Sequence, residues 1–191
     1  MRTDALIIEG ANGFDPCDIQ PMNRQVKTMQ LAKPYRVMIV GYESMPPISK
    51  KCTRFGADFM HPDIKASARL KNVDSLTRGL TYLRGKCDRV LIAPASFPFI
   101  TTATYRQVMD SNAEIAVAEC DGKRGWPVLI SGSLIDETLE VGGLAALPDA
   151  HADSVEIVKT DDVDTVTDVS VKNFSVRLAR TMAAARTCSH S

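Results

Sequence analysis

Short runs of apolar, mostly β-branched residues recur along the chain, and patterns of helical period lie between them. Several of these runs are apolar at every position, which is typical of strands buried on both faces of a parallel sheet. The predicted strands cover residues 5–8, 36–40, 89–92, 114–118, 128–130 and 155–158.

Three segments have helical periodicity. Leu76, Leu80 and Leu83 stand at positions i, i+4 and i+7 and predict one buried stripe. Residues 105–109 predict a short helix. Apolar residues at three- and four-residue steps predict a long C-terminal amphipathic helix over about residues 166–187.

Because strands and helices alternate, we expect right-handed βαβ units and therefore an α/β fold. This fold is a three-layer sandwich with a Rossmann-like, mainly parallel sheet and helices on both faces. The length of 191 residues fits a single domain, residues 1–191. Ligands of open α/β sheets bind beyond the carboxyl ends of the strands. The irregular segments that follow strands, residues 9–23 and 93–100, are therefore the first places to look for chemistry.

Composition narrows the classes of partner. The 23 Lys and Arg residues balance the 23 Asp and Glu residues, so the chain lacks the basic surface typical of nucleic-acid binding or of a membrane anchor. No apolar run approaches the roughly 20 residues that span a bilayer, and the N-terminus turns acidic too early for a signal peptide. The five cysteines are odd in number and widely spaced, and the three histidines match no metal signature. We therefore expect reduced thiols in a cytoplasmic protein without zinc.

The loop after the first predicted strand carries two glycines, which let backbone N–H groups approach an anion closely. Its candidate phosphate-binding residues are Gly10, Ala11, Asn12 and Gly13. The loop matches neither common phosphate-binding motif, and it contains three carboxylates and no Lys or Arg. From the residues alone, it is either a structural turn or a phosphate loop.

Two other segments carry candidate chemistry before the last strand. One predicted strand ends in a proline-stiffened turn with Ser96 near its tip. Trp126, the only tryptophan, follows Lys123 and Arg124. Its ring either stacks on a base or packs beside a strand.

The segment of residues 160–168 holds four carboxylates directly after the last predicted strand. Carboxylates in this arrangement can share a divalent cation with phosphate oxygens. Alternatively, Thr165 or Asp164 caps the C-terminal helix and Asp168 complements its dipole. Since the loop of residues 9–22, the Ser96 turn and this acidic segment all follow strands, we expect them to converge at one edge of the sheet.

Taken in order, these segments resemble the MobA-like NTP transferases, the nucleotidyltransferases of molybdenum-cofactor maturation and their relatives. The opening signature of that family reads A-L-I-L-A-A-G-x-S-x-R-M-G-x-x-K-P-L, and residues 5–8 and 21–22 fit its two ends without a gap. Later family motifs read S-L-x-x-G-L, P-x-D-x-P, R-G-H-P-V-L-x and D-[IV]-D-T-P-E-D. The segments similar to them are residues 74–80, 91–98, 124–130 and 162–168.

The resemblance implies a nucleotide-diphospho-sugar transferase-like fold, a nucleotide (CTP or GTP) as ligand and a molybdopterin-type acceptor. The residues that it assigns to the nucleotide are Gly10, Ala11, Asn12, Gly13, Gln20 and Ser75. It assigns Mg²⁺ to Asp162 and Asp164, and it places Asp15, Ser96, Lys123, Arg124 and Trp126 at the rim of the site.

The departures from the family pattern fall on the charged positions. Asp15 stands in place of an arginine, Gln20 in place of a lysine and Ser96 in place of the Mg²⁺-binding aspartate. Ala11 replaces a loop glycine, and Trp126 replaces a histidine. The sequence therefore predicts a degenerate member that retains at most nucleotide or partner binding.

Two alternatives remain open. One is an active Mg²⁺-dependent nucleotidyltransferase that takes its positive charge from Lys50, Lys51, Lys123 or Arg124. The other is a non-catalytic interaction subunit that pairs with a protein partner or forms a homo-oligomer.

Overall fold

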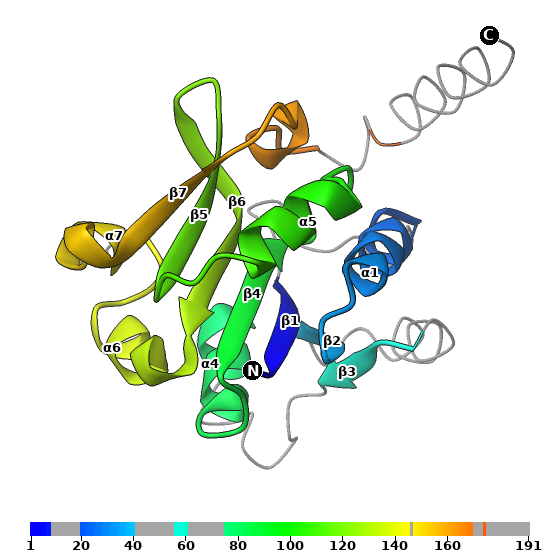
Figure 1. Ribbon diagram of the computed structural model, residues 1–191. Coiled ribbons are helices and arrows are strands. Elements are labelled where there is room, and N and C mark those ends of the chain that lie inside the picture. The colour runs from blue at the N-terminus through cyan, green and yellow to red at the C-terminus, as the bar shows by residue number, and fades with distance from the viewer. Residues whose placement is uncertain (9–19, 41–55, 61–74, 146, 170–173, 175–191) are drawn as a thin grey trace, which may run out of the picture.

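The computed structural model describes residues 1–8, 20–40, 56–60, 75–145, 147–169 and 174, and the structural statements below refer to these residues. Its centre is a seven-stranded sheet with strand order β3-β2-β1-β4-β6-β5-β7 (Figure 1). The strands are β1 Thr3–Ile8, β2 Arg36–Val40, β3 Asp58–Met60, β4 Arg89–Pro94, β5 Ile115–Cys120, β6 Lys123–Ser131 and β7 Val155–Lys159.

Strand β6 runs antiparallel to both of its neighbours, and every other strand pair in the sheet is parallel. The two-residue turn Asp121–Gly122 reverses the chain between β5 and β6, and both residues have positive φ, 51° and 73°. An Asp-Gly turn of this conformation has the twist that a tight hairpin needs. The sheet is therefore mainly parallel, as predicted, with one antiparallel strand set by this turn.

Helices cover both faces of the sheet and make the outer layers of the sandwich (Figure 1). One buried cluster combines β1, β2 and β4 side chains with α1 and α5, and a second cluster combines their other faces with α4 and α6. The predicted three-layer α/β fold is therefore confirmed. The helices are α1 Gln20–Ala32, α4 Ser75–Leu83, α5 Thr102–Met109, α6 Ile135–Glu140 and α7 Leu147–Ala150, with 3-10 turns at Gly132–Leu134, Ala152–Ser154 and Val163–Thr165.

All six predicted strands are present, but the sequence prediction omitted β3 and α1. Helix α1 begins at Gln20, so the irregular segment expected at residues 9–23 ends earlier. Residues 166–169 are not helical, so no helix starts at residue 166; Phe174 is helical, and the rest of the predicted C-terminal helix lies outside the described residues.

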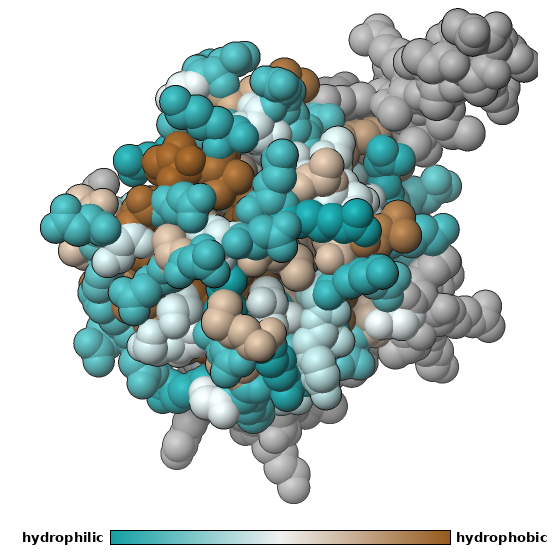
Figure 2. All heavy atoms as spheres, in the orientation of Figure 1, coloured by the Kyte–Doolittle hydropathy of each residue, from teal (hydrophilic) through white to brown (hydrophobic). Residues whose placement is uncertain are grey.

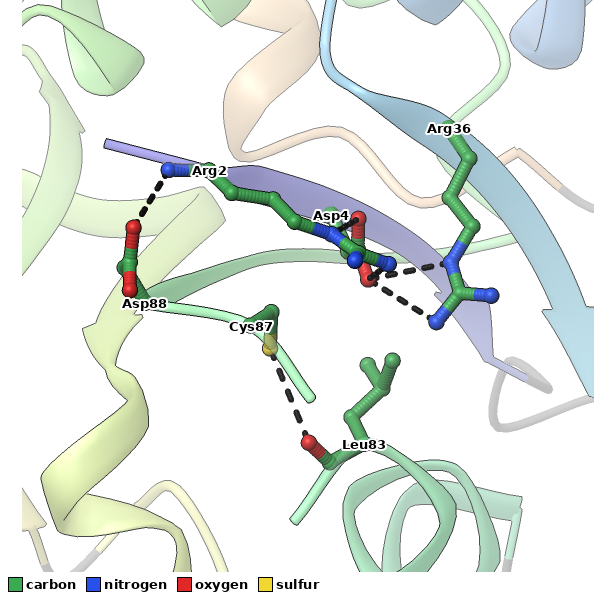
Figure 3. A network of polar contacts seen from close by, with 6 residues as sticks. All are labelled: Arg2, Asp4, Arg36, Leu83, Cys87 and Asp88. Carbon is green, nitrogen blue, oxygen red and sulfur yellow. Dashed lines mark hydrogen bonds and ion pairs between the residues drawn. The ribbon is translucent and has the colours of Figure 1, made fainter. Parts of the chain in front are cut away.

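A buried ion-pair network fixes the start of β1 (Figure 3). Asp4 is fully buried, and its Oδ2 lies 2.9 Å from Nη2 of Arg36 and 3.3 Å from Nη2 of Arg2. Asp4 and Arg36 are register partners on the parallel strands β1 and β2, which places their side chains on the same face. A buried carboxylate is costly unless it is paired, so the two guanidinium groups offset the cost of burying the Asp4 side chain.

We predict that Asp4→Asn lowers the free energy of unfolding by about 3–5 kcal/mol, because it leaves two guanidinium groups around a site without a charge. Urea denaturation measures this loss. The matched control is Asp136→Asn, which removes a carboxylate from an exposed ion pair with Arg84 and should cost less than about 1 kcal/mol. Equal losses in the two variants would contradict this account of β1.

Two of the five cysteines lie in the described residues, and both are free thiols. Burial, followed by the nearby Asp4 carboxylate, raises the pKa of Cys87 to about 11. Burial likewise raises the pKa of Cys120. Both groups are therefore neutral thiols at pH 7, whereas the thiolate is the reactive form.

We predict that a thiol reagent counts five free groups in the denatured, non-reduced protein, and that Cys87 and Cys120 react slowly in the native protein at pH 7. Peptide mapping after short labelling identifies the slow sites, and the reaction of Cys87 should accelerate as the pH rises toward about 11. A count of three in the denatured protein would reveal a disulfide.

No helix in the described part of the chain is long and apolar enough to cross a membrane.

Candidate functional site

The turn after β4, the start of α1 and the segment after β7 meet at the carboxyl edge of the sheet, the upper edge in Figure 1. The side-chain amide of Gln25 in α1 donates to the Pro94 carbonyl oxygen at 2.8 Å. The backbone N–H of Val169 donates to the Ser96 carbonyl oxygen, also at 2.8 Å. The expected convergence is therefore confirmed for these segments, whereas residues 9–19 lie outside the described residues.

The turn after β4 places Ser96 beside the end of β1. The Ala95 N–H donates to the Ile8 carbonyl oxygen at 2.8 Å, and the Phe97 N–H donates to the Pro94 carbonyl oxygen at 3.1 Å and closes the turn. The Ser96 hydroxyl oxygen is buried and has no hydrogen-bond partner among the described residues. This hydroxyl is neutral and is able to donate a hydrogen bond to a bound ligand.

The carboxylate of Asp162 is already used by the fold. Its Oδ2 accepts hydrogen bonds from the Thr101 N–H at 2.8 Å and from the Thr104 hydroxyl at 2.7 Å. Its Oδ1 accepts from the Asp164 N–H at 3.1 Å and caps the 3-10 turn Val163–Thr165. Asp162 thus caps this turn and also ties the segment to the N-terminus of α5. The cap of the C-terminal helix, which the sequence suggested to be Thr165 or Asp164, lies outside the described residues.

Gly125 in β6 lets the same segment approach the sheet. A Cβ at this position would overlap the carbonyl oxygen of Thr165 and also meet the Val166 side chain. The acidic segment is thus held on two sides, by the α5 threonines and by the bare backbone of β6.

Arg24, which the sequence analysis did not select, adds a cation to this edge. Its guanidinium carbon lies 4.7 Å from the centroid of the Phe99 ring, and Phe99 packs on Phe174 at 5.3 Å between ring centroids. Partial burial lowers the pKa of Arg24, and the nearby negative charge of Asp164 raises it. The Nε atom of Arg24 is buried without a hydrogen-bond partner among the described residues.

These residues do not fit a divalent cation of the Mg²⁺ type. A hard cation takes several oxygen ligands, with carboxylates as its anchors. Ser96 offers a neutral hydroxyl, both oxygens of Asp162 accept hydrogen bonds within the fold, and Asp164 lies close enough to Arg24 to interact with its charge. Across the described ranges, no group of three His, Cys, Asp or Glu residues could hold a metal ion.

A pocket of about 850 Å³ opens between the start of α5, the β5–β6 hairpin and the segment after β7. Four carboxylates and one lysine line it, so its charge disfavours a phosphate group. Figure 2 shows that this side of the molecule is mainly hydrophilic, apart from a hydrophobic patch beside β7. The lining residues are Thr101, Ala103, Thr104, Gln107, Glu119, Asp121, Gly122, Lys159, Thr160, Asp161, Asp162 and Val163.

The other predicted site residues occupy varied positions. Gln20 is the first residue of α1, and Ser75 is the buried first residue of α4. Trp126 is half-buried and packs against Phe97, with 6.4 Å between ring centroids, which favours its packing role. Lys123 and Arg124 are exposed on the β5–β6 hairpin. The structure does not describe Gly10, Ala11, Asn12, Gly13 and Asp15.

The sheet order and the convergence of these segments are those of an α/β nucleotidyltransferase-type domain. Residues 20–158 match the MobA-like NTP transferase domain family, and the chain belongs to this family. The matched region begins at α1 and ends within β7. It therefore contains Arg24 and Ser96 but neither the loop of residues 9–19 nor the acidic segment.

Solved structures share this fold at low sequence identity. Rv0371c from Mycobacterium tuberculosis H37Rv has a TM-score of 0.71 at 14% identity, over 93% of this chain and 98% of that one. A nucleotidyl transferase from Methanothermobacter has a TM-score of 0.68 at 15% identity, over 98% and 99% of the two chains. The 4-diphosphocytidyl-2C-methyl-D-erythritol synthase of Anaerococcus prevotii has a TM-score of 0.72 at 12% identity, over 95% and 96%. None of the curated proteins matches the sequence.

A complex of Rv0371c with manganese also shares the fold, with a TM-score of 0.58 at 14% identity over 83% of this chain and 87% of that one. A divalent metal is thus bound by a protein of this fold, which makes the donor set at the Ser96 edge the point to test in this chain.

We predict that Gly125→Ala destabilises the protein by about 1–3 kcal/mol, as expected for overpacking, and loosens the turn at residues 163–166. Hydrogen exchange of the Thr165 and Val166 amides should accelerate more than that of the β1 amides. The control is Gly85→Ala, where the added Cβ meets no atom within 4 Å but the φ of 67° is strained. That variant should leave exchange at residues 165 and 166 unchanged; acceleration in both variants would contradict the packing role of Gly125.

Proposed function

We propose that this protein is a degenerate member of its family, which binds a nucleotide such as CTP or GTP but does not transfer it at an ordinary enzymatic rate. The observation that carries the proposal is the donor set at the carboxyl edge. A neutral hydroxyl stands at Ser96, and the Asp162 carboxylate is committed to Thr101 and Thr104. The free thiols of Cys87 and Cys120 are consistent with the cytoplasmic location that we infer for it.

The chemistry of nucleotidyl transfer explains why this donor set matters. The reaction needs little covalent help from the protein; it needs positioning, a divalent metal and cations on the departing pyrophosphate. In the proposed alignment with the family loop, Asp15 and Gln20 also replace two such cations. A carboxylate about 4 Å from a phosphate oxygen repels it by about 4 kcal/mol at an effective dielectric near 20. In the proposed function, the substitutions at residues 15, 20 and 96 together weaken the binding and activation of the triphosphate.

Nucleotide binding at this edge remains physically reasonable. We assign contacts with the nucleotide to Ser75 at the start of α4 and to Gln20 at the start of α1, together with the loop residues Gly10, Ala11, Asn12 and Gly13. The position of Ser75 is supported by the close packing of its helix, because Gly79 allows α4 to pack directly against Leu6 of β1. Lys123 and Arg124, the exposed cations of the β5–β6 hairpin, remain candidate rim residues.

We predict no Mg²⁺-dependent release of pyrophosphate from CTP or GTP with a pterin-type acceptor. A coupled pyrophosphate assay measures this directly. The reason is that residues 15, 20 and 96 lack the charges that would bind a complex of Mg²⁺ and triphosphate. Asp15 and Gln20 stand in place of two cations, and Ser96 stands in place of a carboxylate. A wild-type turnover on the order of 1 s⁻¹ or more would contradict the proposal and favour the active transferase, with Lys123 and Arg124 as the first residues to substitute.

The matched gain-of-function variant combines Asp15→Arg, Gln20→Lys and Ser96→Asp. It should bind nucleotide more tightly in the presence of Mg²⁺, and each single reversion should do less, since all three act on the same bound group and do not simply add. Saturable binding by the wild type appears as thermal stabilisation, about 2.7 kcal/mol at a hundredfold excess over Kd. Its absence for both nucleotides would favour the interaction subunit instead.

A further inference from the structure

We propose that Arg24 takes the place of the divalent cation at this edge, so that the protein binds a phosphate group of its nucleotide directly and without metal. This inference rests on the proposed nucleotide binding and specifies how it occurs. Its basis is the juxtaposition of a half-buried guanidinium with the Ser96 turn and Asp164.

Three observations place Arg24 at this edge. It belongs to α1, whose neighbouring residue Gln25 is bonded to Pro94 at the end of β4. Its guanidinium lies over Phe99, three residues beyond Ser96, and interacts with the charge of Asp164. The cation therefore lies near Asp164, one of the two aspartates that the family resemblance assigned to Mg²⁺.

The positive charge of Arg24 attracts a phosphate group and repels a metal ion. Arginine stays protonated in proteins, so the positive charge is permanent. A divalent cation placed beside Asp164 would be repelled by this guanidinium, and it would find a hydroxyl at Ser96 in place of a carboxylate. A phosphate group, in contrast, gains an attraction.

The orientation of the guanidinium suits an oxyanion. The guanidinium carbon lies 4.7 Å from the Phe99 ring centroid, and this contact with an aromatic face uses none of the five N–H donors of the arginine. The buried Nε of Arg24 and the buried Ser96 hydroxyl have no partners in the described part of the chain. Because a buried polar group without a partner is costly, an acceptor that satisfies them is stabilised. Phosphate oxygens accept bonds from arginine in pairs.

The neighbouring pocket supports the same location for the phosphate. Its four carboxylates, among them Glu119, Asp121 and Asp161, face a single lysine, Lys159. A phosphate is therefore directed away from this pocket and toward the Arg24 side of the edge.

The test measures the binding of CTP, GTP and the matching nucleosides by calorimetry, once with MgCl₂ and once with EDTA. The wild type should bind one of the triphosphates with Kd values that agree within about twofold in the two buffers. Arg24→Gln, which keeps most of the packing on Phe99, should weaken triphosphate binding at least about tenfold in both buffers and leave nucleoside binding unchanged. Arg24→Lys should recover part of the loss, because it restores the charge without the paired donors.

Lys86→Ala is the matched control, since it removes one positive charge at the opposite edge, where Lys86 lies over the Tyr82 ring. It should bind triphosphate as the wild type does. The double variant Arg24→Gln/Ser96→Asp should regain triphosphate binding only when Mg²⁺ is present. Thermal unfolding of each variant confirms that it is folded.

Two results would overturn the inference while leaving the proposed nucleotide binding intact: wild-type binding that is lost in EDTA, or binding by Arg24→Gln that equals the wild type. Absence of triphosphate binding by the wild type in both buffers would overturn the proposed function and this inference together.

Discussion

The hydrogen bonds of the Asp162 carboxylate are the constraint on which the functional edge depends. They tie the segment after β7 to the start of α5 through Thr101 and Thr104, while Gly125 admits the same segment against β6. With this segment in place, Val169 can bond to Ser96 and Asp164 can interact with Arg24. A carboxylate that performs this structural work has both oxygens engaged. The same interaction therefore organises the edge, and in the proposed function it leaves Asp162 less available as a metal ligand.

The charges described at this edge belong to the side chains of the protein. The chain as a whole is neutral, with 23 basic and 23 acidic residues, yet its charges are unevenly placed. Carboxylates gather around the pocket next to α5, whereas the Arg24 guanidinium interacts with the charge of Asp164, which does not line that pocket. The chain belongs to the MobA-like NTP transferase domain family, but a fold alone does not determine the chemistry of its site.

Much of the fold followed from apolar periodicity, because buried strands and the Leu76–Leu80–Leu83 stripe leave a clear pattern. Helix α1 was not predicted, because polar residues lie between its buried residues Met22, Val26 and Met29. One of its buried residues, Gln25, is itself polar. Strand β3 has only three residues and is too short to give a pattern.

The site was less predictable because its chemistry depends on contacts between distant segments. Spacing suggested Asp162 as a metal ligand, but its partners Thr101 and Thr104 lie about sixty residues away in the sequence. The same holds for Arg24, whose importance appears only when Phe99 and Asp164 are beside it. The turn at residues 121–122, in contrast, carried a local Asp-Gly signal for the antiparallel hairpin.

The central proposal is that the described residues of this edge form no divalent-cation site. The most direct measurement is titration of the protein with Mn²⁺, followed by electron paramagnetic resonance of the free ion. The account predicts no stoichiometric site tighter than about 0.1 mM, and no change in weak binding on Asp164→Asn. One Mn²⁺ bound per chain below that concentration, and lost on Asp164→Asn, would contradict it.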